Sequence, residues 1–489
     1  MNLKNALRCG PALALALAFP GFANGDDATA SDIPQKVAAT RLEMKQILEG
    51  SKQSKPRLPL PPLTPEDQAK AKTRAAERAK TQPTDSAKTK GRSGGLGGII
   101  NNGRMRGYYL SPDVSGGFNR TGATQRGATA TNAGAPGNAG PGREADPAMS
   151  LSGTFKTEFF WIVSRANNCY YCQGHQESKL AADGLSEDTI AALDGDWSEF
   201  TPAERAAFAF TLKLTKTPQA IADADIAALR AFYKDTQILE IIQTVAGNNA
   251  MNRWTGSLAI PQESHRVYLT PTSPKYQSVR SLVAPLDPAA KDGTLCALPT
   301  DRGPLPTRSE IEAALEACRN RSPRLSLIDD SAARALLPDV SADKPVPQWV
   351  RLVLTFPKSG PGRVTSHKNA ISKGRLTVKL KAEIDYVAAL HDRAWYALGH
   401  AQERLRELGM TDDMIAAVAT PSETLTASER AALALAKKLT VDPARITDAD
   451  IAALRANFND FETAEVVFQI TEAASFDRLT EAAGLQLER

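Results

Sequence analysis

The sequence predicts an all-α protein in which two similar helical bundles follow a largely disordered, exported N-terminal region. Three observations support this prediction. Beyond residue 155, apolar residues recur at the i, i+3, i+4 and i+7 spacing of amphipathic helices, and the alternation typical of strands is absent. The segment DADIAALRA occurs at 223–231 and again at 448–456. The N-terminal part is instead rich in Pro, Gly, Ala and charged residues.

Residues 1–25 are expected to be a secretory signal peptide. Lys4 and Arg8 precede an apolar run from Pro11 to Phe19, and small residues follow it. This run is too short to span a bilayer, and no later stretch is long enough, so we expect no membrane insertion. A retained membrane anchor is the alternative. After cleavage, the protein is expected in the periplasm, the cell envelope or the extracellular space.

Two segments are expected between the signal and the first bundle. Residues 26–93 are predicted to be an extended, basic tether that contains one amphipathic helix over 33–50. Residues 94–150 form a lead-in segment whose apolar start, 94–110, is expected to dock on the first bundle. Its Gly- and Ala-rich part, 115–142, has too few large apolar residues to offset the entropy of ordering, which predicts a disordered insertion. The basic residues of the tether lack interleaved aromatic side chains, so nucleic-acid binding is not expected.

The first bundle is predicted over residues 151–260, and local signals mark its helices. The asparagines at 167–168 suit a turn between two helices. Ser186, followed by two acidic residues, is expected to cap a helix. The sequence TPAE at 201–204 has the pattern of a capping box with proline at the first helical position. The Ile, Leu and Val residues of 238–245 have the spacing of a buried helix.

The stretch from Glu158 to His175 carries the residues expected to do chemistry. Cys169 and Cys172 form the only CxxC of the chain, a spacing that places two side chains one turn apart on a helix. If Asn168 caps this helix, Cys169 lies in the first turn, where free N–H groups and the helix dipole favour a thiolate. His175 follows Cys172 by one turn and is placed to accept its proton. Glu158 lies about 16 Å from Cys169 along a straight helix, so it joins the site only if the chain turns between them.

Other interpretations of the cysteine pair remain open. The pair is also compatible with a structural disulfide or with inert buried thiols, and His175 with a purely structural role. Zinc needs a fourth ligand, and no second CxxC or HxxxH motif is present. A c-type haem needs CxxCH, but Gln173 follows Cys172. We therefore expect no bound metal or cofactor. If the pair is redox-active, an external dithiol is expected to reduce it.

This order of acid, CxxC and histidine resembles the carboxymuconolactone decarboxylase family, specifically its alkyl hydroperoxide reductase D-like, peroxidase-related branch. The resemblance implies an all-helical fold in which Cys169 and Cys172 are the redox pair. It also implies that Glu158 and His175 relay protons to and from this pair. The substrate would be a small hydroperoxide, and the reductant a dithiol protein. Members are oligomers with sites near subunit contacts, so a homo-oligomer is expected.

A second bundle is predicted over 323–489, because a shift of 225 residues carries the first bundle onto it without a gap. The shift pairs Glu158 with Glu383 and His175 with His400, whereas alanine occupies both positions that correspond to the cysteines. An acid and a histidine without thiols resemble the decarboxylase-type branch of the same family, which makes Glu383 and His400 a possible second site. Two fused copies are expected to look like a dimer within one chain, and further association, for example of three chains, is plausible.

Two charged residues of each bundle also coincide under the shift. Glu240 corresponds to Glu465, and Arg253 corresponds to Arg478. A buried acid–arginine pair that holds each bundle together is the interpretation we favour. It requires no role in catalysis.

Residues 261–322 are expected to form a connector between the bundles. Cys296 and Cys318 lie in it, and an oxidising compartment permits a structural disulfide between them. Such a bond would close a loop of about 20 residues and stabilise the fold by about 3 kcal/mol. Two unpaired thiols are the alternative. The segments PRLPL at 56–60 and PRLSL at 323–327 predict a matching lead-in for each bundle.

The leading hypothesis is a thiol-dependent peroxidase, an antioxidant oxidoreductase that uses the CxxC pair and a Glu/His proton relay. Which cysteine attacks the peroxide is open: the helix terminus favours Cys169, and proximity to His175 favours Cys172. One alternative is a decarboxylase- or isomerase-type enzyme in which Glu and His transfer a proton. The other is a non-catalytic scaffold or binding protein of the envelope. The net charge of +4 is small for 489 residues and does not distinguish among them.

Overall fold

The computed structural model is helical throughout the ranges that it describes. These ranges are residues 31–63, 65, 68–69, 100–115, 146–264, 266–290, 292–296, 304–337, 344–419 and 424–488. They contain no β-strand, only two isolated β-bridges, so the all-α prediction is confirmed. The expected signal peptide, most of the second half of the expected tether and the Gly- and Ala-rich insertion lie outside the described residues. None of the helices in these ranges is long and apolar enough to cross a lipid bilayer.

Two series of six α-helices follow the same order along the chain. The first helix set comprises α5 (Gly153–Ala166), α6 (Tyr170–Ala182), α7 (Glu187–Ala192), α8 (Pro202–Lys216), α9 (Asp223–Arg230) and α10 (Asp235–Ser257). The second helix set comprises α16 (Val378–Asp392), α17 (Trp395–Glu407), α18 (Asp412–Val418), α19 (Ala427–Val441), α20 (Asp448–Arg455) and α21 (Asp460–Ala482). Each helix of the second set begins 225 residues after its counterpart in the first.

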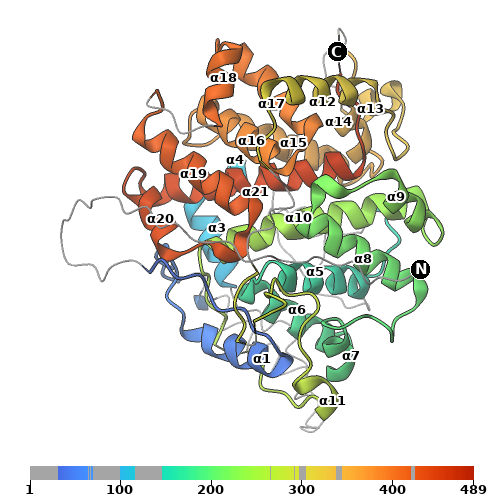
Figure 1. Cartoon of the computed structure of the whole chain (residues 1–489), viewed down its shortest axis with the longest axis vertical. Coiled ribbons are helices and arrows are strands. Elements are labelled where there is room, and N and C mark those ends of the chain that lie inside the picture. Colours follow the sequence, from blue (N-terminus) through green and yellow to red (C-terminus); the bar gives the residue numbers. More distant parts are fainter. Residues whose placement is uncertain are drawn as a thin grey trace.

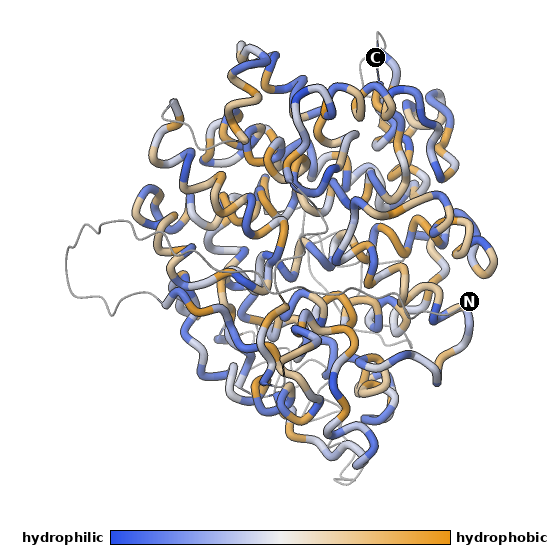
Figure 2. The backbone as a smooth tube through the Cα atoms, in the orientation of Figure 1, coloured by the Kyte–Doolittle hydropathy of each residue, from blue (hydrophilic) through white to orange (hydrophobic). Residues whose placement is uncertain are grey.

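Shorter helices flank and connect the two sets. They are α1 (Arg41–Gly50), η1 (Ser51–Gln53), α3 (Asn101–Tyr109), α4 (Pro112–Ser115), η3 (Pro218–Ala220), α11 (Pro274–Gln277), α12 (Arg308–Asn320), α13 (Asp330–Leu336), α14 (Gln348–Val353), α15 (Gly360–Ser372) and η5 (Pro443–Arg445). Hydrophobic and hydrophilic stretches alternate along the helices, as expected where one side of each helix faces a core (Figure 2).

Several helices begin at the capping signals in the sequence. Ser186 accepts a hydrogen bond from a backbone N–H in the first turn of α7. Thr201 and Glu204 form the expected capping box of α8, and Thr426 and Glu429 form the same box in α19. These side chains satisfy N–H groups that lack a partner within the helix, so local sequence defines where these helices begin.

The two sets meet where α10 and α21 pack side by side across the middle of the molecule (Figure 1). Arg253 on α10 donates to the carbonyl of Thr440 on α19 at 3.1 Å. Arg478 on α21 donates to the carbonyl of Thr215 on α8 at 3.3 Å. Because these positions correspond under the shift of 225 residues, the contact is reciprocal, as in the interface of a two-fold dimer.

The buried acids of α10 and α21 pair with lysines instead of these arginines. Glu240 binds Lys156 at 2.7 Å, and Glu465 binds Lys381 at 2.8 Å. Each carboxylate also accepts backbone N–H groups from the segment before α5 or α16. The expected acid–arginine pairs are therefore wrong, because the arginines extend across the contact between the two sets.

Residues 31–63, expected as part of an extended tether, fold against the first helix set. The helix predicted over 33–50 is present as α1, although it begins only at Arg41. Leu48 is fully buried. Arg41 is buried as well and donates to both carboxylate oxygens of Glu177, at 2.7 and 2.8 Å. These residues were expected in an extended tether, but they pack on the first helix set through a buried ion pair, which corrects the prediction here.

The matching segments PRLPL and PRLSL occupy equivalent places. The N–H of Arg57 donates to the carbonyl of Leu258 at 3.0 Å, and its guanidinium binds Asp448 at 2.6 Å. Arg324 repeats both contacts: its N–H donates to the carbonyl after α21 at 2.8 Å, and its guanidinium binds Asp223 at 2.6 Å. Each lead-in arginine therefore reaches the first residue of the DADIAALR helix in the opposite set.

The apolar start of the lead-in segment forms α3, which contacts both sets. The N–H of Asn101 donates to Glu263 at 3.0 Å on the side of the first set. At the other end of α3, the ring of Tyr109 lies 5.4 Å from that of Phe461 on α21. The expected docking on the first bundle is thus only part of what this helix does.

Cys296 and Cys318 are not joined by a disulfide, so the expected bond is not formed. Cys318, near the end of α12, is buried, and its thiol lies 3.5 Å from the carbonyl of Leu485. Burial raises the pKa of the Cys318 thiol to about 11. The carbonyl of Cys296 instead accepts a hydrogen bond from Arg445. The two cysteines contact different segments of the chain, which keeps them from bonding to each other.

Candidate dithiol site

The turn between α5 and α6 places Cys169 at a helix terminus. Asn168 has φ 53°, a left-handed conformation that asparagine tolerates better than most residues. Cys169 follows as the N-cap of α6, and its Sγ accepts the N–H of Cys172 at 3.4 Å. The capping residue is thus Cys169 itself, one position later than expected. The thiol pair opens a helix, where a negative sulfur is favoured by the dipole and by free N–H groups.

Both sulfurs of the pair converge on one hydroxyl. Cys169 Sγ and Cys172 Sγ each lie 3.0 Å from Oγ1 of Thr255 on α10. The same hydroxyl lies 2.9 Å from the carbonyl of Met251, so its proton can turn toward either the carbonyl or a sulfur. The cysteines are 1% and 2% exposed. The pair is therefore a buried cluster whose polar neighbours include Thr255 and Asn252.

The environment separates the pKa values of the two thiols. Burial raises the pKa of Cys169, but hydrogen bonds from the Cys172 thiol, the Thr255 hydroxyl and the Cys172 N–H outweigh it and lower that pKa. Burial and the adjacent Cys169 hold the pKa of Cys172 well above its usual range. The hydrogen bonds around the pair thus favour the thiolate form of Cys169 over that of Cys172.

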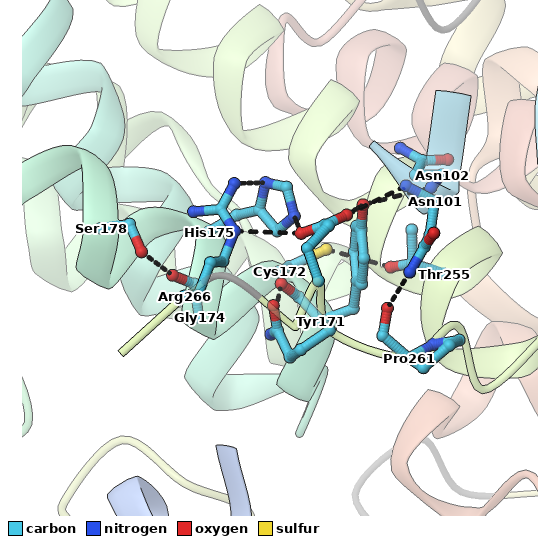
Figure 3. Close-up of polar contacts among 12 residues, drawn as sticks. Asn101, Asn102, Tyr171, Cys172, Gly174, His175, Ser178, Thr255, Pro261 and Arg266 are labelled. Atoms are coloured by element: carbon cyan, nitrogen blue, oxygen red, sulfur yellow. Dashed lines mark hydrogen bonds and ion pairs between the residues drawn. The ribbon is translucent and has the colours of Figure 1, made fainter. Parts of the chain in front are cut away.

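His175 lies one turn after Cys172, yet its ring contacts other residues. Nε2 lies 2.8 Å from Glu263, and Nδ1 lies 3.1 Å from a guanidinium nitrogen of Arg266. Figure 3 shows His175 and Arg266 on one side of Cys172 and Thr255 on the other. Because Arg266 can only donate, Nδ1 carries no proton and Nε2–H donates to Glu263. Burial lowers the pKa of His175 to about 4, so the ring is neutral near pH 7.

Glu263 joins four donors around this histidine. Its carboxylate accepts the N–H of Asn101 at 3.0 Å, the hydroxyl of Tyr171 at 2.7 Å, and the side chains of His175 and Arg266 at 2.8 and 3.0 Å. Burial alone would raise the pKa of Glu263, but hydrogen bonds from His175, Tyr171 and Asn101 hold it below its usual range. Three separate segments of the chain therefore meet at one ionised carboxylate.

The segment that carries Glu263 lies over the start of α6. Gln262 donates to the carbonyls of Tyr170 and Tyr171 at 2.7 and 3.0 Å. This approach requires glycine at 174, because a Cβ there would collide with the Gln262 side chain. Residues 261–264 and Arg266, expected as the start of a connector, thus lie against α6 and supply two polar groups around His175.

Glu158 lies apart from the thiols. It is buried on α5, and burial, reinforced by the nearby charge of Glu204, raises its pKa to about 8. Within the described residues, no hydrogen bond joins Glu158 to Cys169, Cys172 or His175. The structure therefore brings together the two cysteines, but it holds the acid and the histidine in contacts of their own.

The second helix set repeats the polar framework without the sulfurs. His400 Nε2 lies 3.1 Å from Glu488, whose carboxylate also accepts the Tyr396 hydroxyl at 2.9 Å. These residues follow His175, Glu263 and Tyr171 by 225 positions. Glu383, the counterpart of Glu158, instead binds Lys379 at 2.6 Å. The predicted second pair, Glu383 and His400, is thus not joined by a direct contact.

Sequence reasoning missed Tyr171, Thr255 and Glu263. A signal for them exists, because the 225-residue shift also pairs them with Tyr396, Thr480 and Glu488. No protein-family model and no curated protein matches the chain. The geometry of the site therefore carries the functional argument.

Proposed function

We propose that the chain is a thiol-dependent peroxidase of the alkyl hydroperoxide reductase D-like kind, acting through Cys169 and Cys172. The observation that carries the proposal is the convergence of both sulfurs on the Thr255 hydroxyl, at 3.0 Å each, with Cys169 capping a helix. This arrangement stabilises one thiolate beside one thiol, which is the resting state that such a reaction needs. The lowered pKa of Cys169 and its place at the helix terminus support it as the attacking residue.

The reaction balances within the pair. The Cys169 thiolate attacks one oxygen of a hydroperoxide ROOH, so that an S–O bond forms, the O–O bond breaks and RO⁻ leaves. The thiol of Cys172 gives RO⁻ its proton, which yields ROH. The Cys172 thiolate then attacks the sulfenic sulfur of Cys169, forming the disulfide and releasing hydroxide. An external dithiol reduces the disulfide by exchange and is itself oxidised.

The burial of the pair favours a small oxidant. At 1% and 2% exposure, the sulfurs are reachable only by a small peroxide or after the residues around them, including the segment that carries Glu263, move. Reduction by a dithiol protein requires that movement, because a mixed disulfide cannot form on a covered sulfur. His175 and Glu263 hold that segment in place, so we assign them a positioning role.

We further propose that the two helix sets are tandem copies of one bundle, and that the chain is exported. The equal spacing of the helix starts and the reciprocal contacts of Arg253 and Arg478 support a dimer-like unit within one chain. Export rests on residues 1–25 alone, which lie outside the described residues.

The test replaces each cysteine separately. With tert-butyl hydroperoxide and dithiothreitol, we expect Cys169→Ser to reduce turnover to the background rate. With dithiothreitol left out, Cys172→Ser should consume one peroxide per chain and stop at a sulfenic acid that dimedone traps. Cys318→Ser, a buried thiol outside the pair, is the control and should retain turnover. Unchanged turnover in a variant lacking both Cys169 and Cys172 would overturn the proposal.

A further inference from the structure

The second helix set encloses a cavity where the first holds its thiols. The cavity has a volume of about 230 Å³, and helices α14, α15, α16, α17 and α21 contribute its walls. Ala397, the counterpart of Cys172, and His400, the counterpart of His175, both face it. Its volume lies below the roughly 300–1,000 Å³ of pockets for drug-sized ligands, so any occupant is small.

One wall of this cavity is aromatic. The ring of His367 stacks on Phe476, with centroids 4.3 Å apart and an interplanar angle of 16°. Trp349 meets His367 edge to face at 4.8 Å. Burial lowers the pKa of His367 to about 3, so this ring is neutral near pH 7. Neutral aromatic faces suit hydrocarbon groups and attract cations.

Helix α21, which supplies Phe476, also brings to the cavity two residues that each have an unpartnered oxygen among the described residues. Asp477 and Gln469 are 2% and 1% exposed, and both face the cavity. Within the described residues, Oδ2 of Asp477 and Oε1 of Gln469 have no hydrogen-bond partner. An unpartnered buried oxygen costs free energy, and a donor from a bound molecule would recover it. These two oxygens therefore mark where a ligand with N–H groups would bind.

The charges around the cavity favour a cation. The titratable groups that face it are Lys368 and His367 of α15, Asp385 of α16, His400 and Arg404 of α17, and Glu472 and Asp477 of α21. Arg404 binds Asp385 at 2.5 Å, which neutralises both. Lys368 is exposed to solvent and His400 pairs with Glu488. Glu472 and Asp477 remain without a cationic partner.

Neither of the two remaining carboxyls forms an ion pair within the described residues, although the charge of Arg478 opposes the rise in the pKa of Asp477. Burial and the nearby Asp385 raise the pKa of Glu472 to about 7. Burial and the nearby Asp392 hold the pKa of Asp477 well above its usual range. A carboxylated ligand would meet this acidic wall unfavourably. No three His, Cys, Asp or Glu side chains in the described ranges are grouped to hold a metal ion, so the cation that fits is organic.

These features belong to the second set alone. Glycine 247 and Asn252 stand at the positions that correspond to Glu472 and Asp477, and Phe160 stands where Asp385 is. The framework is shared, but the acidic side chains are not.

We propose that this cavity binds a small organic ammonium ion. Glu472, Asp477 and Oε1 of Gln469 accept the N–H groups of the ligand, and its hydrocarbon part lies against Trp349 and Phe476. The site is independent of the thiol pair.

The test compares three probes of similar shape by isothermal titration calorimetry with the full chain. Benzylammonium is cationic, benzyl alcohol neutral and benzoate anionic. We expect benzylammonium to bind at least about tenfold more tightly than either of the others. Equal or tighter binding of benzoate or benzyl alcohol, or no binding of benzylammonium, would refute the proposal.

Two sets of substitutions test whether benzylammonium binds in this cavity. Proton release by the unaltered chain on binding is a second, independent test. Glu472→Gln combined with Asp477→Asn should weaken benzylammonium binding by at least about tenfold, whereas Glu403→Gln, an exposed acid on α17, should not change it. In the unaltered chain, the cation favours ionised Glu472, so binding near pH 7 should release protons and tighten as pH rises. Calorimetry in two buffers of different ionisation enthalpy detects that release. Binding without proton release and with constant affinity across this pH range would contradict the site.

Discussion

The first helix set holds a thiol pair where the second holds a cavity, although the residues around both are arranged alike. Tyr171, His175 and Glu263 make the contacts that Tyr396, His400 and Glu488 repeat. The hydroxyl that receives both sulfurs has its counterpart in Thr480, which donates to a backbone carbonyl at 2.9 Å as Thr255 does. One framework can therefore support different chemistry when a few side chains at its centre change.

A second difference concerns the acid on the long helix before the site. In the second set, Lys379 lies 2.6 Å from both Glu383 and Glu429 and joins them. In the first set, Thr154 takes the place of this lysine, and Glu158 faces Glu204 without a bridging cation. Burial raises the pKa of both Glu158 and Glu383, and Lys379 opposes that rise only in the second set.

The largest expected effect is a transfer of the thiol pair. In a chain lacking Cys169 and Cys172, the substitutions Ala394→Cys and Ala397→Cys should create a new pair that peroxide oxidises. The backbone is prepared for it, since Ala394 has φ −87° and ψ 82° against −90° and 93° for Cys169. Turnover should return, roughly tenfold slower than in the natural pair because Asp477 replaces Asn252 beside it.

Thiol counting before and after peroxide treatment checks this transfer. The chain with both natural cysteines replaced and the alanines intact is the control. If the new pair stays reduced, the shared framework is not sufficient for the reaction.

Removing the central carboxylate should affect the two sets unequally. Glu263→Ala leaves the buried Arg266 and the Asn101 N–H without their acceptor, which is expected to cost about 3–5 kcal/mol in the free energy of unfolding. Glu488 has a side chain 30% exposed, so water can replace it, and Glu488→Ala should cost about 1 kcal/mol. Urea denaturation followed by circular dichroism measures both. Equal costs would show that burial does not separate the two carboxylates.

A smaller effect should appear in the pH dependence of stability. Glu158 has a folded pKa of about 8 against an ordinary value of 4.5, so the folded chain binds more protons between these values and loses stability as pH rises through them. Glu158→Gln keeps the shape of the side chain without its charge. It should stabilise the chain by about 2 kcal/mol near pH 8 and change its stability little near pH 4.5.

The counterpart substitution tests whether the lysine bridge explains this difference. Glu383→Gln removes the ion pair to Lys379, which opposes the burial that raises the pKa of Glu383, so it should give a smaller gain. The thermal unfolding temperatures of the two variants near pH 4.5 and near pH 8 make the comparison. A matching gain for Glu383→Gln would mean that the bridge does not matter.

Local signals allowed much of the architecture to be predicted. Ser186, Thr201 and Thr426 cap helices as their sequences indicate, and the repeated DADIAALRA marks the same helix in both sets. The thiol pair was also placed at a helix terminus. In each case the decisive contact lies within a few residues of the chain, where spacing and capping patterns are informative.

Contacts between distant residues were not predictable in this way. The packing of residues 31–63 was missed because it depends on distant partners. Arg41, for example, binds Glu177, which is 136 residues away. Glu263 was predicted to lie in a connector, yet its carboxylate accepts a hydrogen bond from the N–H of Asn101, 162 residues before it. Neither periodicity nor capping reports such pairs. The His175 ring turns toward Glu263 and Arg266 because of these same contacts. The spacing of residues in the sequence therefore could not show that it makes no contact with a thiol.

The arginines of the two lead-in segments each bind the opposite helix set, so each set supplies a contact that the other needs. Arg57 precedes the first set yet ends on Asp448 of the second, and Arg324 precedes the second yet ends on Asp223 of the first. A fragment cut after the first set would therefore expose one flank of α10 and leave Asp223 without its arginine. Since Asp223 and Asp448 are interchangeable in this contact, such a fragment would find what it lacks in another molecule of itself.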